Sequence, residues 1–251
     1  MTLADLSGKT IVITGASSGI GRSVAVLVSQ LGGDAVLIAR RQDQLEKTAE
    51  LMTRTPAIYV YDLQDIDGIG PLIRRVICDL GAADGLVHCA GVLPIVGLRG
   101  ITQSMAEKTM RINFYAFIEL AKHLTAVGAY RSGMSLVGIS SYGASRGAAG
   151  KTLYSASKAA LEAAVRCLAV ELAAKQIRVN CVAPGVVRTP LVADYVKQAD
   201  SSEDIREALS RQYLGIGDPS DVASLVAFML SSSSQFITGA TLPVDGGKVS
   251  W

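Results

Sequence analysis

Charged residues are scarce in this chain, because Asp, Glu, Lys and Arg make up only 18% of its 251 residues. The 24 basic and 22 acidic side chains nearly cancel, and no run of like charge occurs. Binding to nucleic acid or to an anionic membrane surface requires a concentrated patch of positive charge. The charge balance therefore predicts neither kind of partner, while a local site for a small anion stays open.

Cysteine is also rare, and its four residues form no Cys-x-x-Cys pair. All four lie among apolar neighbours, which predicts buried free thiols in a reducing compartment rather than disulfides or metal ligands. These residues are Cys78, Cys89, Cys167 and Cys181. We therefore expect no metal site.

The sequence also shows no pattern typical of a targeting signal or a membrane span. Residues 1–9 carry an acid and lack the basic and then apolar order of a secretory signal, which favours a cytoplasmic location. The charge-free stretch 222–244 is interrupted by four consecutive serines and by Pro243. It predicts a helix, a loop and a strand rather than a membrane span.

Apolar residues are abundant, at 49% of the chain with a mean hydropathy of +0.35. Segments with helical periodicity at 20–31, 44–52 and 155–174 alternate with short β-branched runs. This alternation predicts an α/β fold of Rossmann type, a doubly wound and mostly parallel sheet flanked by helices on both faces. With no linker or repeat, we expect one domain over residues 1–251. The seven expected strands are 10–13, 35–39, 57–61, 85–89, 135–139, 177–182 and 241–244.

A glycine-rich turn follows the first expected strand directly. Its glycines let the backbone turn tightly and approach a pyrophosphate at the start of the next helix. A plain connection of small residues is the alternative, but the position between strand and helix favours a dinucleotide site. The expected contacts are Gly15, Ser17, Ser18, Gly19, Ile20 and Gly21.

Two arginines close the second expected strand, where a site for NAD usually places an acid that binds the ribose 2′-hydroxyl. Arg40 and Arg41 would instead pair with a 2′-phosphate, and Ser17 could add a hydroxyl donor. The alternative is that both are solvated charges at a helix entry. The pattern predicts NADP(H) as the cofactor.

Tyr154 is the one tyrosine of eight with a lysine four residues later. That spacing puts Tyr154 and Lys158 on one face of a helix. A cation beside a phenol lowers its pKa from about 10 toward the working pH. The pair predicts a tyrosine that acts as an acid or a base.

Together with Ser141 and the glycine turn, Tyr154-x-x-x-Lys158 resembles the short-chain dehydrogenase/reductase family over nearly the whole chain. The resemblance implies that Tyr154 gives a proton to a carbonyl oxygen that Ser141 also binds. It further implies that Lys158 holds the nicotinamide ribose and that Asn113 links Lys158 to water. Asp62 and Leu63 resemble the adenine-binding pair, and the cofactor is expected to meet Ala90, Gly91, Pro184, Gly185, Val187 and Thr189, besides Tyr154 and Lys158.

One pair of residues departs from the family pattern. His88 and Cys89 stand where two asparagines usually precede Ala-Gly. A catalytic or metal-binding role for His88 is one interpretation. A hydrogen-bonded structural histidine is favoured, because no second ligand has a recognisable spacing.

The substrate is expected to lie between residues 92–103 and residues 189–217. The second segment has apolar side chains at helical spacing. These side chains would either form a lid over the substrate or simply pack against the protein surface. The family resemblance implies a small carbonyl or alcohol substrate, and the chain is similar to 3-oxoacyl-acyl-carrier-protein reductases. Arg131 and Lys175 lie near positions where those enzymes carry basic residues for the carrier protein. The family resemblance also implies that the protein forms a homotetramer or a homodimer.

Two other functions stay open. One is an alcohol or steroid-type dehydrogenase that uses NAD(P)⁺. The other is a regulatory protein that senses NADP(H) without turnover, although such a protein would not need Asn113, Ser141, Tyr154 and Lys158 together.

Overall fold

The computed structural model describes residues 4–193 and 212–248, and its centre is one seven-stranded sheet. The strand order is β3-β2-β1-β4-β5-β6-β7, and every neighbouring pair is parallel. The predicted Rossmann-type sheet is therefore confirmed. The strands are β1 (Thr10–Thr14), β2 (Asp34–Ala39), β3 (Ala57–Val60), β4 (Ala83–His88), β5 (Tyr130–Ile139), β6 (Arg178–Pro184) and β7 (Thr241–Val244).

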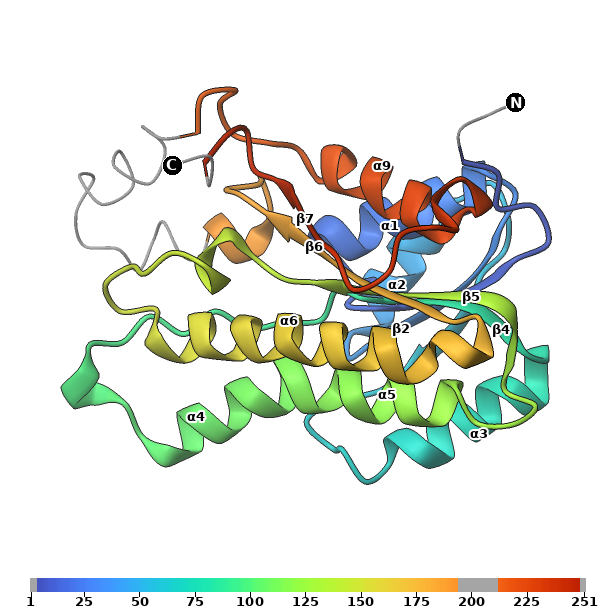
Figure 1. Cartoon of the computed structure of the whole chain (residues 1–251), viewed down its shortest axis with the longest axis horizontal. Helices are drawn as coiled ribbons and strands as arrows, with labels where there is room; N and C mark the ends of the chain where they lie inside the picture. Colours follow the sequence, from blue (N-terminus) through green and yellow to red (C-terminus); the bar gives the residue numbers. More distant parts are fainter. Residues whose placement is uncertain (1–3, 194–211, 249–251) are drawn as a thin grey trace.

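Helices cover both faces of the sheet (Figure 1). One face carries α1 (Gly19–Gln30), α2 (Gln42–Ala49) and α9 (Pro219–Leu230), whose buried residues share one apolar core. The other face carries α3 (Ile69–Leu80), α5 (Ala116–Leu124) and α6 (Thr152–Leu172). The short helix α4 (Gln103–Met110) leads into α5 through a π-helical turn at Arg111–Tyr115.

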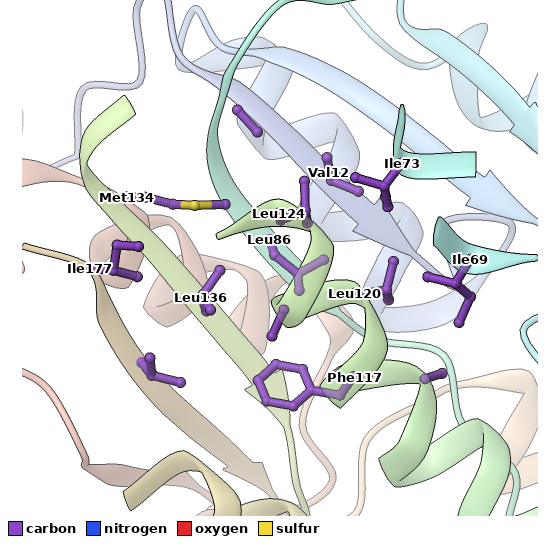
Figure 2. Packing of buried hydrophobic residues seen from close by; sticks show 14 of the residues in the cluster. Val12, Ile69, Ile73, Leu86, Phe117, Leu120, Leu124, Met134, Leu136 and Ile177 are labelled. Carbon is purple, nitrogen blue, oxygen red and sulfur yellow. The ribbon is translucent and has the colours of Figure 1, made fainter. Parts of the chain in front are cut away.

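The apolar runs of the sequence form strands that are buried between the two layers of helices. All five residues of β1 are buried, as expected for a strand covered on both faces. Figure 2 shows Phe117, Leu120 and Leu124 of α5 packed against the sheet, close to Leu86 of β4 and Leu136 of β5. All five are fully buried, and each stabilises the fold by about 1.5–3 kcal/mol.

The boundaries of some elements differ from the prediction. β5 begins at Tyr130 rather than Ser135, because Tyr130 pairs with Ala83 of β4, and an irregularity in the register separates this pair from the next, Gly85 with Ser135. α6 begins at Thr152, so Tyr154 lies in its first turn. Residues 222–244 form the end of α9, a short turn and β7, as predicted.

The prediction of four buried thiols was wrong for two of them. Cys78 and Cys167 are exposed because they lie on the solvent faces of α3 and α6, whereas Cys181 is buried and Cys89 partly so. All four are free thiols. Across residues 4–193 and 212–248, we find no helix with both the length and the apolar character of a membrane span.

Candidate active site

A cavity of about 390 Å³ opens at the carboxyl edge of the sheet, where the strand order reverses between β1 and β4. This switch point is where open α/β sheets bind ligands. The cavity brings together the glycine turn and the ends of β2, β3 and β4. Among its lining residues are the predicted Gly15, Ser17, Ser18, Gly19, Ile20, Gly21, Arg40, Arg41, Asp62, Leu63, Ala90, Gly91 and Thr189.

The glycine turn fits closely against the end of β4. Gly15 has φ of +67°, and a Cβ there would lie 2.7 Å from the backbone nitrogen of Ala90. A Cβ on Gly21 would collide with the carbonyl oxygen of Gly15. The side chain of Ser18 makes no capping hydrogen bond at the start of α1, so it leaves the helix's first N–H groups to a ligand. These residues therefore fit the pyrophosphate of a dinucleotide.

The predicted arginines lie at the far end of this cavity. Arg40 and Arg41 are exposed, and Arg41 Nη2 lies 3.4 Å from Ser17 Oγ. The sequence reasoning missed Arg22, which donates to the carbonyl of Ser17 (2.6 Å) and to Thr48 Oγ1 (3.0 Å). Arg22 thereby holds the glycine turn against α2. Its place directly after Gly21 was the available signal.

The predicted catalytic side chains meet where β5 ends and α6 begins. Ser141 begins a short 3₁₀ turn, and its Oγ accepts a hydrogen bond from the backbone of Gly143 (3.1 Å). A Cβ on Gly143 would lie 3.4 Å from Ser141 Oγ and 3.6 Å from Cε1 of Tyr154. Lys158 Nζ is 5.8 Å from the centre of the Tyr154 ring and donates to the carbonyl of Ile139 (2.7 Å). The three side chains thus share one site.

The expected direction of the Tyr154 pKa was wrong. Burial raises the pKa of Tyr154 above its usual value, and a hydrogen bond with Ser141 only partly opposes this. Burial also lowers the pKa of Lys158 to about 8. Removal of both groups from water outweighs the attraction expected from their spacing. The phenol is therefore protonated at neutral pH.

Asn113 lies inside the π-helical turn and ties two segments together. Its Nδ2 donates to the carbonyl of Val92 (3.0 Å) and to Ser157 Oγ (2.9 Å), while its Oδ1 accepts from the Val92 amide (2.8 Å). A Cβ on Gly91 would lie 3.4 Å from Asn113 Oδ1 and 3.5 Å from Lys158 Nζ. Asn113 therefore joins the loop after β4 to α6 beside Lys158. Ser157 was not singled out from the sequence.

His88 is fully buried and hydrogen-bonded on both ring nitrogens, which confirms the structural interpretation. Its Nε2 lies 3.0 Å from the carbonyl of Ile112 and must donate there, so its Nδ1 accepts from Thr14 Oγ1 (2.9 Å). Thr14 Oγ1 accepts in turn from the Ala90 amide (3.3 Å). Burial, aided by the charge of Lys158, lowers the pKa of His88 to about 3. His88 therefore joins β1, the loop after β4 and the turn that holds Asn113.

Its neighbour Cys89 is not a nucleophile, because burial raises the pKa of the thiol to about 12. No three His, Cys, Asp or Glu side chains gather as a metal site would require, within the part of the chain that the structure describes.

The segment after β6 contributes less to the cavity than the resemblance implied. Pro184 ends β6, a Cβ on Gly185 would lie 2.9 Å from Cα of Asp245, and Val187 is buried in the core. None of these three lines the cavity just described, whereas Thr189 does. Most of the predicted lid, residues 194–211, lies outside the described residues.

The two basic residues considered for a carrier protein lie at the other edge of the sheet. Arg131 is near the start of β5 and pairs with Asp84 (2.5 Å). Lys175 follows α6 and donates to the carbonyl of Thr125 (3.3 Å). Because the strands are parallel, both residues lie away from Tyr154 within one chain.

Comparison with known proteins agrees with this geometry. The family described as Enoyl-(Acyl carrier protein) reductase matches residues 15–248. A 3-oxoacyl-acyl-carrier-protein reductase, FabG, from Thermotoga maritima is 32% identical over 97% of this chain and 99% of its own. A structure described as a NAD(P)-dependent gluconate 5-dehydrogenase from Beutenbergia cavernae, with bound NADP, is 28% identical with a TM-score of 0.91, over 98% of this chain and 99% of its own.

A blue fluorescent protein from a metagenomic library, solved in complex with NADPH, is 31% identical with a TM-score of 0.88, over 98% of this chain and 99% of its own. The matches extend over nearly the full chain, and they agree with the glycine turn and with the position of Tyr154 and Lys158 beside Ser141. This protein therefore belongs to the short-chain dehydrogenase/reductase family of oxidoreductases, which act on alcohols and ketones with a nicotinamide cofactor.

Proposed function

We propose that this protein uses NADPH to reduce a carbonyl compound to a secondary alcohol, with Tyr154 as the proton donor. The observation that carries the proposal is the position of Tyr154, whose ring lies beside Ser141 and Lys158 at the carboxyl edge of the sheet. The cavity lined by the glycine turn opens at the same edge.

When bound, a nicotinamide dinucleotide supplies hydride to the carbonyl carbon, and negative charge then develops on the carbonyl oxygen. Tyr154 gives its proton to that oxygen, and its raised pKa keeps the proton available at neutral pH. Ser141 donates a hydrogen bond to the same oxygen. Lys158 adds positive charge and binds the ribose hydroxyls. Asn113 holds α6 through Ser157, next to Lys158, and links that lysine to water.

The preference for NADP(H) rests on Arg40, Arg41 and Ser17, which line one end of the cavity. Two exposed guanidinium groups there favour a 2′-phosphate and offer no carboxylate to a 2′-hydroxyl. Because cells generally keep NADP reduced, a preference for NADP(H) also favours the reductive direction. Replacing both arginines with alanine should lower kcat/KM for NADPH at least tenfold and change that for NADH much less.

The similarity to FabG supports a substrate carried on acyl carrier protein as one member of the carbonyl class. Arg131 and Lys175 do not support it, because both have partners at the far edge. We also propose a cytoplasmic homodimer or homotetramer. The exposed Tyr115 and Val170, near α5 and on α6, offer apolar surface for such contacts.

The test is a spectrophotometric screen of NADPH oxidation over ketones, diketones, quinones, keto sugars and β-ketoacyl thioesters. Tyr154→Phe should bind NADPH normally and lose nearly all turnover, because the phenyl ring fills the same space without a proton to donate. Retained turnover would refute the role of Tyr154. Tight NADPH binding with no carbonyl reduced would instead favour a sensor, and faster oxidation of alcohols would favour a dehydrogenase.

A further inference from the structure

Glu162 is a partly buried carboxylate on α6 to which the proposed reaction assigns no role. It follows Lys158 by four residues, and this spacing places both side chains on one face of the helix. Its Oε1 accepts a hydrogen bond of 2.6 Å from Oγ of Ser140, a residue that is only 2% exposed. Removing a carboxylate from water costs free energy that such a hydrogen bond offsets. The contact therefore holds Ser140 firmly against α6.

Ser140 is the middle one of three consecutive residues at the end of β5 that serve the active site. The carbonyl of Ile139 before it accepts a hydrogen bond from Lys158 Nζ (2.7 Å), and Ser141 after it would bind the substrate oxygen. The Ser140 amide donates to the carbonyl of Val182 on β6 (2.7 Å). Its backbone is thus held by the sheet and its side chain by α6. A displacement of Ser140 would move both the anchor of Lys158 and the hydroxyl of Ser141.

Glu162 also supplies negative charge near the Lys158 ammonium. Burial lowers the pKa of Lys158 to about 8, and the groups that oppose this effect are Cys181, Cys89 and Glu162. Burial raises the pKa of both thiols to about 12, so neither carries charge when Lys158 titrates. The carboxylate of a glutamate, in contrast, is charged at neutral pH. Of these three groups, Glu162 is therefore the one whose charge favours the ammonium form of Lys158 at neutral pH.

Two more titratable groups face Lys158, and both are uncharged at neutral pH. His88 at the end of β4 is neutral because burial lowers its pKa to about 3. Tyr154 on α6 keeps its proton because burial raises its pKa. An opposite charge favours the charged form of a buried group. Because a pKa of about 8 lies close to neutral pH, loss of the Glu162 charge would leave a larger fraction of Lys158 uncharged.

We propose that Glu162 is a positioning residue for the reaction, which holds Ser141 in place through Ser140 and balances the positive charge of Lys158. The hydrogen bond fixes the donor that meets the carbonyl oxygen. The charge keeps Lys158 able to stabilise the negative charge that develops on that oxygen. Glu162 acts through these two residues and takes no part in proton transfer itself. This inference rests on the proposed reductase function and adds a residue to its machinery.

Two substitutions separate the hydrogen bond from the charge. Glu162→Gln keeps an oxygen that accepts from Ser140 but removes the charge, whereas Ser140→Ala removes the hydrogen bond and keeps the charge. Glu171→Gln removes the same charge from an exposed position near the end of α6 and is the matched control. For each variant, kcat and KM are measured at pH 6.5 and pH 8.5 with NADPH and a ketone that the wild-type protein reduces.

The dependence on pH distinguishes a positioning role from a general loss of stability. Glu162→Gln should lower kcat/KM about threefold or more at pH 8.5 and little at pH 6.5, where Lys158 stays protonated without help. Ser140→Ala should lower kcat about tenfold at both pH values and leave KM for NADPH nearly unchanged. Glu171→Gln should match the wild-type protein throughout. Equal losses in Glu162→Gln at the two pH values, or none at either, would overturn the inference.

Titration of Lys158 itself separates failure of this inference from failure of the reductase function. In the full chain with isotopically labelled lysine, the ε-carbon NMR signal that disappears in Lys158→Arg reports the ionisation of Lys158 without any turnover. Its titration midpoint should fall by about 0.5–1 pH unit in Glu162→Gln and stay in place in Glu171→Gln. If the midpoint falls but no ketone is reduced, the charge pairing stands and the reductase function fails. If ketones are reduced but the midpoint does not move, the reductase function stands and the role of Glu162 is refuted.

Discussion

His88 makes the stability of this protein depend on acid in a predictable way. The imidazole is fully buried with both nitrogens hydrogen-bonded, and its pKa falls to about 3 in the folded chain. In the unfolded chain the pKa is near 6.5. As the pH falls below that value, the unfolded chain binds a proton that the folded chain does not, so His88 lowers the stability progressively until about pH 3. The loss should reach about 2 kcal/mol at pH 5.

The assay is urea unfolding followed by circular dichroism at pH 7.5 and pH 5, at one protein concentration. His88→Asn is the matched variant, because an amide can donate to Ile112 and accept from Thr14 without titrating. Carboxylates and the other histidine, His123, contribute equally to both proteins, so their effects cancel in the comparison.

The wild-type protein should lose about 2 kcal/mol more than His88→Asn between the two pH values. Lys158 does not interfere, because its pKa of about 8 affects stability only in the alkaline range. An identical pH dependence in the two proteins would show that His88 is not held neutral by burial, and the hydrogen-bond assignment would fall with it.

Two further substitutions test the structure. Gly15→Ala should abolish binding of NADPH in a fluorescence titration, because residue 15 has a φ of +67° and the new Cβ would lie 2.7 Å from the Ala90 nitrogen. Normal affinity for NADPH would mean that the glycine turn does not pack closely against the end of β4. Arg178→Met should lower the free energy of unfolding by about 2–3 kcal/mol, since the buried guanidinium caps the carbonyls of Met229 and Ser231 at the end of α9. Lys47→Met, on the exposed face of α2, is the control. A change in the urea midpoint no larger than that of this control would contradict the capping role.

Much of the fold could be read from local patterns. Short β-branched runs separated by helical periodicity predicted seven strands and a doubly wound sheet, because burial on both faces demands continuous apolar runs. The spacing of Tyr154 and Lys158 likewise placed them on one helical face. The pattern missed pairing between distant segments: Tyr130 pairs with Ala83 of β4 and so extends β5 back from Ser135, although the three residues after Tyr130 are exposed.

The chemistry of the site depended more on tertiary structure. The spacing of Tyr154 and Lys158 predicted a lowered pKa for Tyr154, whereas burial raises that pKa. The reason is that desolvation depends on all the groups packed around the phenol. Arg22 reaches Thr48 on another helix, and His88 reaches Ile112 inside the π-helical turn. Neither contact follows from spacing along the chain.

The sequence by itself determined the class of this protein and predicted which side chains carry its chemistry, because glycine turns, helical spacing and apolar periodicity act over a few residues. Only the tertiary structure decided the protonation and the positioning partners of these side chains. Burial and long-range hydrogen bonds arise when distant segments of the chain meet, so they cannot be predicted from the spacing of residues along the sequence.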